Sequence, residues 1–437
     1  MKRKVLSGCF GVVAFLVVIA CIAKYAGDRR EAALNKTALN KELALARAEG
    51  LPTTWQEFAA TIKPAKPEEN AAKYYQQLRS HRIKKTTDPE KLDAELNLSR
   101  TINAVAAMKS FLAKNSISLE LADQATSLPR CWFDRDWSLG PAVLLPELAD
   151  MKQLAKLVLY RADVAAAEGR VGDAINDANR ARMIGSHAAE EGTLIDDLVG
   201  VSIHAYCLHH VALWRVAQPK VQQYRELSEE LLRSYPKVNL QKANLNLLIW
   251  VRDIVEMSES EDGLRRLGVK KEYVASNESL IKLLINPDRA RVDIALSSRE
   301  IWEALGLTPV ARKPKIEVAR QKLMLSLVCF PTASSVVGAF GSDDAKYDFL
   351  DEQLEAQRLC EVALSRALSS GTIPKTIKTD DLKSPYDSKP IEYKFDGRQI
   401  VITASCTDPD NGPKPIKLPS DQELKLIGAS ASWKVAK

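Results

Sequence analysis

The side chains best suited to chemistry are densest between Leu128 and Trp137. This ten-residue segment holds three aromatic residues, four charged residues and Cys131. A neighbouring cation such as Arg130 lowers the pKa of a thiol toward the reactive thiolate, and Asp134 and Asp136 form a pair of carboxylates suited to acid–base catalysis. The segment Cys131–Asp136 therefore permits a hydrolase. Since it contains no histidine, we favour an ordered loop held by its aromatic side chains and keep the hydrolase as an alternative.

A second group of reactive side chains follows helical spacing. His204, Cys207 and His210 stand three residues apart, with His209 adjacent, so one helix face offers three metal-ligating groups. Ligands along one straight helix converge poorly on a tetrahedral ion, and the surrounding residues are largely apolar. We therefore predict core histidines that hydrogen-bond to neighbouring groups, and no metal site here.

Composition and motifs exclude several classes of protein. The chain has 437 residues, and its 62 Lys and Arg are nearly balanced by 56 Asp and Glu, so no basic patch predicts a nucleic-acid partner. The seven cysteines show no Cys-x-x-Cys spacing, and we expect inert, mostly buried thiols. Motifs for nucleotide binding, zinc proteases and serine hydrolases are absent from the sequence. We predict no cofactor, and an enzyme is the less favoured class.

The N-terminal segment is typical of a membrane anchor. Lys2, Arg3 and Lys4 precede Val5–Ala23, which runs 19 residues without a charge and is long enough, as a helix, to cross a hydrocarbon layer of ~30 Å. The basic start predicts a cytoplasmic N-terminus and an extracytoplasmic body. The expected location is the bacterial inner membrane, crossed once. The alternative is a lipoprotein, because Val18–Cys21 has the form of a cleavage box that would leave Cys21 lipidated.

The remaining chain reads as mainly α. We predict an anchor at 1–27, a helical stalk at 28–50 that Gly50 ends, a multi-helix body at 51–346, and a helix with a small β-rich cap at 347–437. Thr54 and Glu57 have the spacing of a capping box. The apolar stripes of 154–165 and 174–181, separated by Gly169, predict a tight helical hairpin that resembles one tetratricopeptide unit.

Further elements follow from periodicity and prolines. Proline marks the expected helix boundaries at 219, 236, 287, 309 and 314. Alternating apolar residues in 391–395 and 399–403 predict a β-hairpin around Asp396-Gly397, with short strands at 424–427 and 432–435. Helices are expected at 194–216, 222–234, 243–259, 279–284, 288–305, 315–329 and 347–368.

Two resemblances extend this interpretation. A helix to Leu368 is followed by Gly371-Thr372-Ile373-Pro374, a proline-rich loop, a hairpin and the acidic segment Asp408–Gly412. This tail, about 347–418, resembles that of the major pseudopilins of type II secretion. Together with the apolar N-terminus and the segment Glu49–Thr53, the tail also resembles a broad group of uncharacterised single-pass bacterial envelope proteins. This second resemblance covers nearly the whole chain.

The pseudopilin resemblance implies a calcium site. Asp408, Asp410 and Asn411 would be its oxygen ligands. Pro413 departs from the pseudopilin pattern, and the N-terminus lacks the prepilin processing motif. We favour a plain turn at these residues and predict no metal.

These observations predict a membrane-anchored extracytoplasmic protein of the cell envelope. We expect it to bind or scaffold a protein partner there, with the N-terminal helix as its contact to the membrane. The alternatives are an envelope hydrolase that uses Cys131–Asp136 and a pseudopilin-like assembly subunit.

Overall fold

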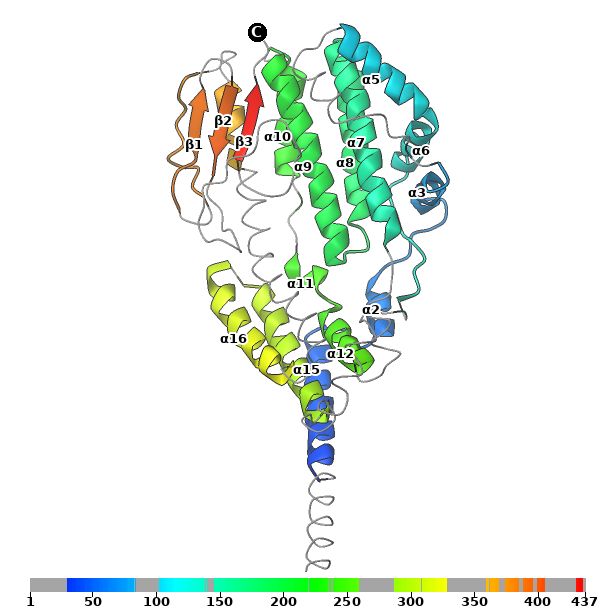
Figure 1. The fold of residues 1–437 in the computed structure, drawn as a ribbon, viewed down its shortest axis with the longest axis vertical. Helices are drawn as coiled ribbons and strands as arrows, with labels where there is room; N and C mark the ends of the chain where they lie inside the picture. The colour runs from blue at the N-terminus through cyan, green and yellow to red at the C-terminus, as the bar shows by residue number, and fades with distance from the viewer. Residues whose placement is uncertain are drawn as a thin grey trace, which may run out of the picture. The chain divides into compact units, whose positions relative to one another are not determined.

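The chain is mainly helical in the computed structural model (Figure 1). The structure describes residues 30–81, 83, 102–137, 139, 145–218, 220–234, 236, 239–258, 287–307, 309–327, 359–360, 362–368, 374–384, 388–395, 399–404 and 430–434. The predicted anchor Val5–Ala23 and Cys21 lie outside these residues. Among the helices described, none combines the length and the apolar composition that a membrane crossing requires. The mainly α fold class is confirmed.

The chain divides into two compact units. One draws on Met1–Ala59, Ser138–Ala142 and Leu245–Gly341, and the other on Ala60–Trp137, Val143–Asn244 and Ser342–Lys437. The second unit, called here the hairpin unit, contains helices α3, α5, α6, α7, α8, α9, α10 and α11 and a small sheet. Their bounds are Ala72–Leu78, Ile102–Lys114, Ser116–Thr126, Pro146–Ala167, Val171–Ala188, Leu194–Ala217, Gln222–Arg233 and Leu240–Ala243.

The predicted helical hairpin is present as α7 and α8. Gly169, at φ +76°, ends α7 in the left-handed region that glycine tolerates best. The N–H groups of Gly169 and Arg170 donate to the carbonyls of Ala166 and Ala165 at 3.2 and 2.8 Å, which satisfies the last turn of the helix. Small buried residues then let the two helices approach closely, namely Ala162, Ala165, Ala166, Ala174, Ala178 and Ala181.

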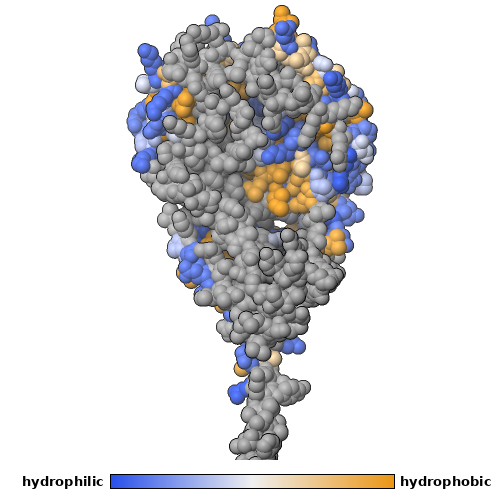
Figure 2. Space-filling view, viewed as in Figure 1, coloured by the Kyte–Doolittle hydropathy of each residue, from blue (hydrophilic) through white to orange (hydrophobic). Residues whose placement is uncertain are grey.

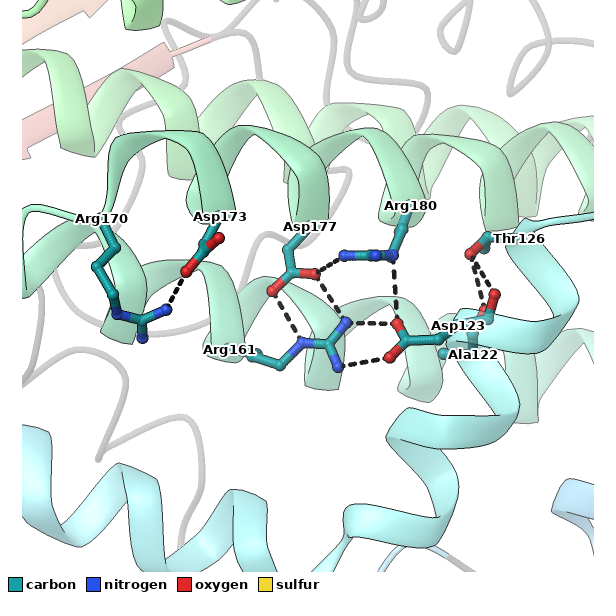
Figure 3. A network of polar contacts seen from close by, with 8 residues as sticks. All are labelled: Ala122, Asp123, Thr126, Arg161, Arg170, Asp173, Asp177 and Arg180. Carbon is teal, nitrogen blue, oxygen red and sulfur yellow. Dashed lines mark hydrogen bonds and ion pairs between the residues drawn. The ribbon is translucent and has the colours of Figure 1, made fainter.

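An ion-pair network joins α6, α7 and α8 (Figure 3). Arg161 on α7 makes bidentate contacts to Asp177 on α8, at 2.7 and 2.8 Å, and to Asp123 on α6, at 2.6 and 3.1 Å. Arg180 reaches the same two carboxylates at 2.7 and 3.3 Å. Planar guanidinium groups suit such paired contacts. The network therefore fixes the position of α6 against the hairpin.

A three-stranded antiparallel sheet packs on α9. Its strands are β1 (Glu392–Phe395), β2 (Gln399–Thr403) and β3 (Ser430–Lys434), in the order β1-β2-β3. The pairs Phe395↔Ile400 and Glu392↔Thr403 set the register of β1 and β2, which confirms the predicted hairpin. Ile400 and Ile402 on β2 alternate into a core shared with α9 and the helical residues 359–360 and 362–368. The third strand, β3, overlaps the strand expected at 432–435, and the strand expected at 424–427 lies outside the described residues.

The other unit contains the helical residues 30–48, α2 (Trp55–Thr61), α12 (Leu247–Ser258), α15 (Pro287–Leu305) and α16 (Pro309–Leu327). Gly50 ends the first helix at φ +86°, as predicted. Arg299 of α15 contacts Glu42 and Glu49 at 3.3 and 3.0 Å, so the predicted stalk packs laterally within this unit.

Two local predictions for this unit need correction. Pro314 lies inside α16 and not at a boundary. Its exposed ring removes one helical hydrogen bond, and the packing of α16 along α15 offsets that loss. The capping box is only half formed: the Glu57 N–H donates to the Thr54 hydroxyl at 3.2 Å, while the Glu57 carboxylate accepts from Thr53.

Candidate functional site

The loop at Arg130–Trp137 is fixed first by backbone pairing within the hairpin unit. The Ala71 N–H donates to the Arg130 carbonyl at 2.8 Å, and the Arg130 N–H donates to Glu69. The Asn70 side-chain amide donates to the Trp132 carbonyl at 2.8 Å and accepts from the Trp132 N–H at 2.9 Å. A short segment before α3 thus holds the loop like an added strand.

Two adjacent glutamates hold the loop from its other side. The Glu190 carboxylate accepts from the Cys131 N–H and pairs with the Arg130 guanidinium. The Glu191 carboxylate accepts from the Phe133 N–H at 2.7 Å and from Arg135 Nε at 2.6 Å. We call this pair, Glu190 and Glu191, the glutamate clamp. Carboxylates that accept from backbone N–H groups and guanidinium groups make strong, directional contacts.

Further charged groups lie around the clamp. Arg135 also reaches Glu147, at the start of α7, at 3.1 Å, and the Arg135, Glu147 and Glu191 side chains are almost fully buried. The next helix, α9, begins at Thr193 with a complete capping box whose carboxylate is Asp196. The loop, α7 and the start of α9 are therefore joined by one buried ionic cluster.

Burial dominates the electrostatics of this cluster. It raises the pKa of Glu191 to about 7 in spite of the neighbouring Arg135. It also raises the pKa values of Asp196 and Asp197 to about 6. Removing carboxylates from water disfavours their charged form. Some of these groups consequently change protonation in the range from pH 6 to 7.

Burial argues against the alternative in which Arg130 activates Cys131 as a nucleophile. The Cys131 thiol is fully buried, and burial, followed by the charges of Glu190 and Glu191, raises its pKa well above the ordinary value. Arg130 does not offset this effect, because its guanidinium pairs with Glu190. Asp134 and Asp136 are exposed and lie outside the clamp. The ordered-loop interpretation is confirmed, with Phe133 and Trp137 buried as expected.

The histidines of α9 are core residues, as predicted. His204 Nε2 lies 2.9 Å from the Leu231 carbonyl oxygen, and His210 Nδ1 lies 2.7 Å from Asp163 Oδ2. The Cys207 thiol lies 3.7 Å from the Ala178 carbonyl oxygen. Burial lowers the pKa values of His204 and His209 to about 4, so both are neutral near pH 7.

No metal centre is found within the described part of the chain, where no three His, Cys, Asp or Glu side chains gather as a ligand set. The candidate calcium ligands Asp408, Asp410 and Asn411 lie outside that part. The described cysteines, Cys131, Cys207 and Cys360, are all buried, which confirms the prediction of buried thiols for these three.

The carboxylates that hold the loop were not predicted from the sequence. Glu147, Glu190 and Glu191 lie 12 to 60 residues from their partners, at distances that periodicity does not reach. One signal was available: the acidic pair Glu190-Glu191 stands at a helix junction beside Gly192, whose φ is +74°. Searches against family models, curated proteins and solved structures found no significant match to this chain.

Proposed function

We propose that the protein is a membrane-anchored binding or scaffolding protein of the bacterial cell envelope. An N-terminal helix would hold it in the inner membrane, with the body on the extracytoplasmic side. The charge pattern of the first 23 residues supports this location. The observation that carries the binding role is the glutamate clamp. It fixes the loop Arg130–Trp137, the segment richest in chemically suitable side chains, in a structural role.

The clamp favours a scaffold over the hydrolase because it removes the proposed nucleophile from reach. A cysteine nucleophile needs a thiolate accessible to substrate. The Cys131 thiol is buried with a raised pKa, and the backbone N–H of Cys131 is already bound by Glu190. This arrangement suits a rigid body that presents its surface to a partner.

The surface of the helical part supports a binding role. Figure 2 shows a hydrophobic patch on the face in view, where the lower ends of α7 and α9 lie in Figure 1. Independently, Ile195 in the first turn of α9 is 56% exposed and Ile117 on α6 is 51% exposed. Exposed apolar side chains contribute to protein contacts when they gather on a rigid surface.

The location is tested by a reporter that is active only outside the cytoplasm, fused after Lys437. We expect activity, and a cytoplasmic reporter that works at this position would overturn the proposed topology. Cys21→Ser separates the two anchors. With an uncleaved helix, apparent mass and membrane retention stay unchanged; loss of fatty-acid labelling in the variant would establish the lipoprotein.

The binding role is tested by cross-linking in intact membranes. A photo-reactive residue replaces Ile195 or Ile117, and adducts are purified after detergent solubilisation. We expect a discrete protein adduct at one or both positions, lost when membranes are treated with urea before illumination. The matched comparison places the same photo-reactive residue in the Cys131→Ala variant. An adduct that persists in this variant agrees with a scaffold. Loss of the adduct while the variant still folds would favour a role for the thiol.

A further inference from the structure

A small pocket lies beside the crossing of α8 and α9 in the hairpin unit. It has a volume of about 80 Å³, which suits a small ion or a single functional group. Side chains from α8, α9 and the end of α10 surround it together with two glycines, and the lining residues are Arg182, Gly185, Ser186, Ala189, Gly200, His204, Ser234 and Pro236.

Arg182 supplies the positive charge of this pocket. Its Nε atom is buried and has no hydrogen-bond partner among the described residues. Among the described residues it forms an ion pair with Glu230 on α10 that is long at 3.4 Å, and the Glu230 side chain is half exposed. A guanidinium has five N–H donors, and an exposed pair of this length contributes little. Arg182 therefore retains donors for a ligand.

Two hydroxyl groups line the pocket together with Arg182. Ser186 and Ser234 each bond to a carbonyl of their own helix, Arg182 O at 3.3 Å and Glu230 O at 2.9 Å. Each hydroxyl has a single O–H, which it gives to that carbonyl here, so it donates to a bound group only when it rotates away from the helix. With its guanidinium and two hydroxyls, the pocket has the donor chemistry of an oxyanion site.

His204 forms the neutral part of the lining. Its Nε2 lies against the Leu231 carbonyl, and burial, reinforced by the charge of Arg182, holds its pKa near 4. The charged groups recorded at this pocket are thus Arg182 and its exposed partner Glu230. An anion beside Arg182 would offset the positive charge that lowers the pKa of His204. The pKa of His204 therefore reports whether an anion occupies the pocket.

We infer that this pocket binds a small oxyanion, a carboxylate or phosphate group, with Arg182 as its charge partner. The volume admits one such group and not a larger metabolite. The inference stands independently of the membrane anchor and of a protein partner. A phosphate can be free or part of a lipid headgroup, and the same donors serve both.

The test is isothermal titration of the full chain in detergent with inorganic phosphate and, separately, with acetate. We expect binding of at least one, weakened about tenfold or more by Arg182→Met and partly retained in Arg182→Lys. Arg225→Met is the matched control, because it removes the same charge from an exposed site on α10. Anion binding should also raise the pKa of His204, followed by NMR.

The inference would be overturned if phosphate, acetate and the acidic vesicles below all failed to bind, or if Arg182→Met and Arg225→Met caused equal losses. If Arg182→Met does not fold, Ser186→Leu takes its place, because Ser186 is exposed at the pocket and leucine fills the space. Binding must then fall while the melting temperature is kept. Vesicles with and without phosphatidic acid distinguish the sources: Arg182-dependent binding to the acidic vesicles alone assigns a lipid headgroup, and binding of free phosphate assigns the soluble ion.

Discussion

Gly185 on α8 and Gly200 on α9 bring two helices into direct backbone contact. A Cβ atom on Gly200 would lie 2.7 Å from the Gly185 carbonyl oxygen and 2.8 Å from the Ala189 Cβ. Only the absence of side chains permits this approach. The contact sets the crossing of α8 and α9 and thereby the wall of the Arg182 pocket.

Gly200→Ala should destabilise the hairpin unit by about 1 to 3 kcal/mol, because the added methyl meets backbone and cannot move into free space. The control is Gly172→Ala at the start of α8, where an added Cβ has no neighbour within 4 Å. That change should be neutral or stabilise by about 0.4 to 1 kcal/mol. Urea denaturation measures both. Equal effects of the two substitutions would contradict the close crossing.

Arg161→Met should destabilise the fold by about 1 to 3 kcal/mol, since it removes the bidentate partner of the nearly buried Asp177 (Figure 3). Arg180 still contacts Asp177 and limits the loss. Arg170→Met is the control on the same hairpin: Arg170 is half exposed and pairs with Glu168 and Asp173, so we expect less than about 1 kcal/mol. Thermal unfolding compares them, and a larger effect at Arg170 would refute the assignment.

The helices and strands were predictable where one pattern repeats locally. The expected helix at 194–216 is α9, Leu194–Ala217, and the expected strand at 399–403 is β2, because apolar spacing and flanking turns mark both. Gly169 was expected to separate the two helices, and the structure shows it there in a left-handed conformation at φ +76°. These signals depend only on residues close together in the chain, so they can be recognised in a single sequence.

The sites were less predictable because their partners are remote. Glu191 and Arg135 are 56 residues apart, and Arg182 gains its pocket from the later helices α9 and α10. Sequence placed Cys131 beside Arg130 and suggested activation, whereas folding pairs Arg130 with Glu190. Pro314 shows the same limit, since tertiary packing retains a helix that a local rule would end.

Cys131 should react slowly with iodoacetamide at pH 8 in the folded protein. The thiol is fully buried and its pKa is raised by burial, so we expect labelling at least ~10-fold slower than for a free cysteine. Peptide mapping by mass spectrometry follows this site separately from the other cysteines. Urea should restore rapid labelling. Fast reaction of the native protein would instead return Cys131 to the list of candidate nucleophiles.

Glu191 should give stability a characteristic pH dependence. Its folded-state pKa, raised by burial from 4.5 to about 7, means that the folded state binds this proton more strongly than the unfolded state. The contribution of Glu191 is therefore complete below about pH 4.5 and is lost as the pH rises through 7. His187 and His204 have pKa values that burial lowers to about 4, and they give the opposite trend. Their contribution to the stability of the fold is lost as the pH falls below about 6.5.

Glu191→Gln isolates the carboxylate because the histidines are common to both proteins and cancel in the difference. Glutamine keeps the neutral form that burial favours, so the unfolding free energy of the wild type should fall relative to the variant by on the order of 1 to 3 kcal/mol between pH 5 and 8. Chemical denaturation at several pH values gives this difference directly. Glu229→Gln, on the exposed side of α10, should show almost no pH-dependent difference. If Glu191→Gln behaves in the same way, the Glu191 carboxylate is ionised throughout this range and the buried clamp is a permanent ion pair with Arg135.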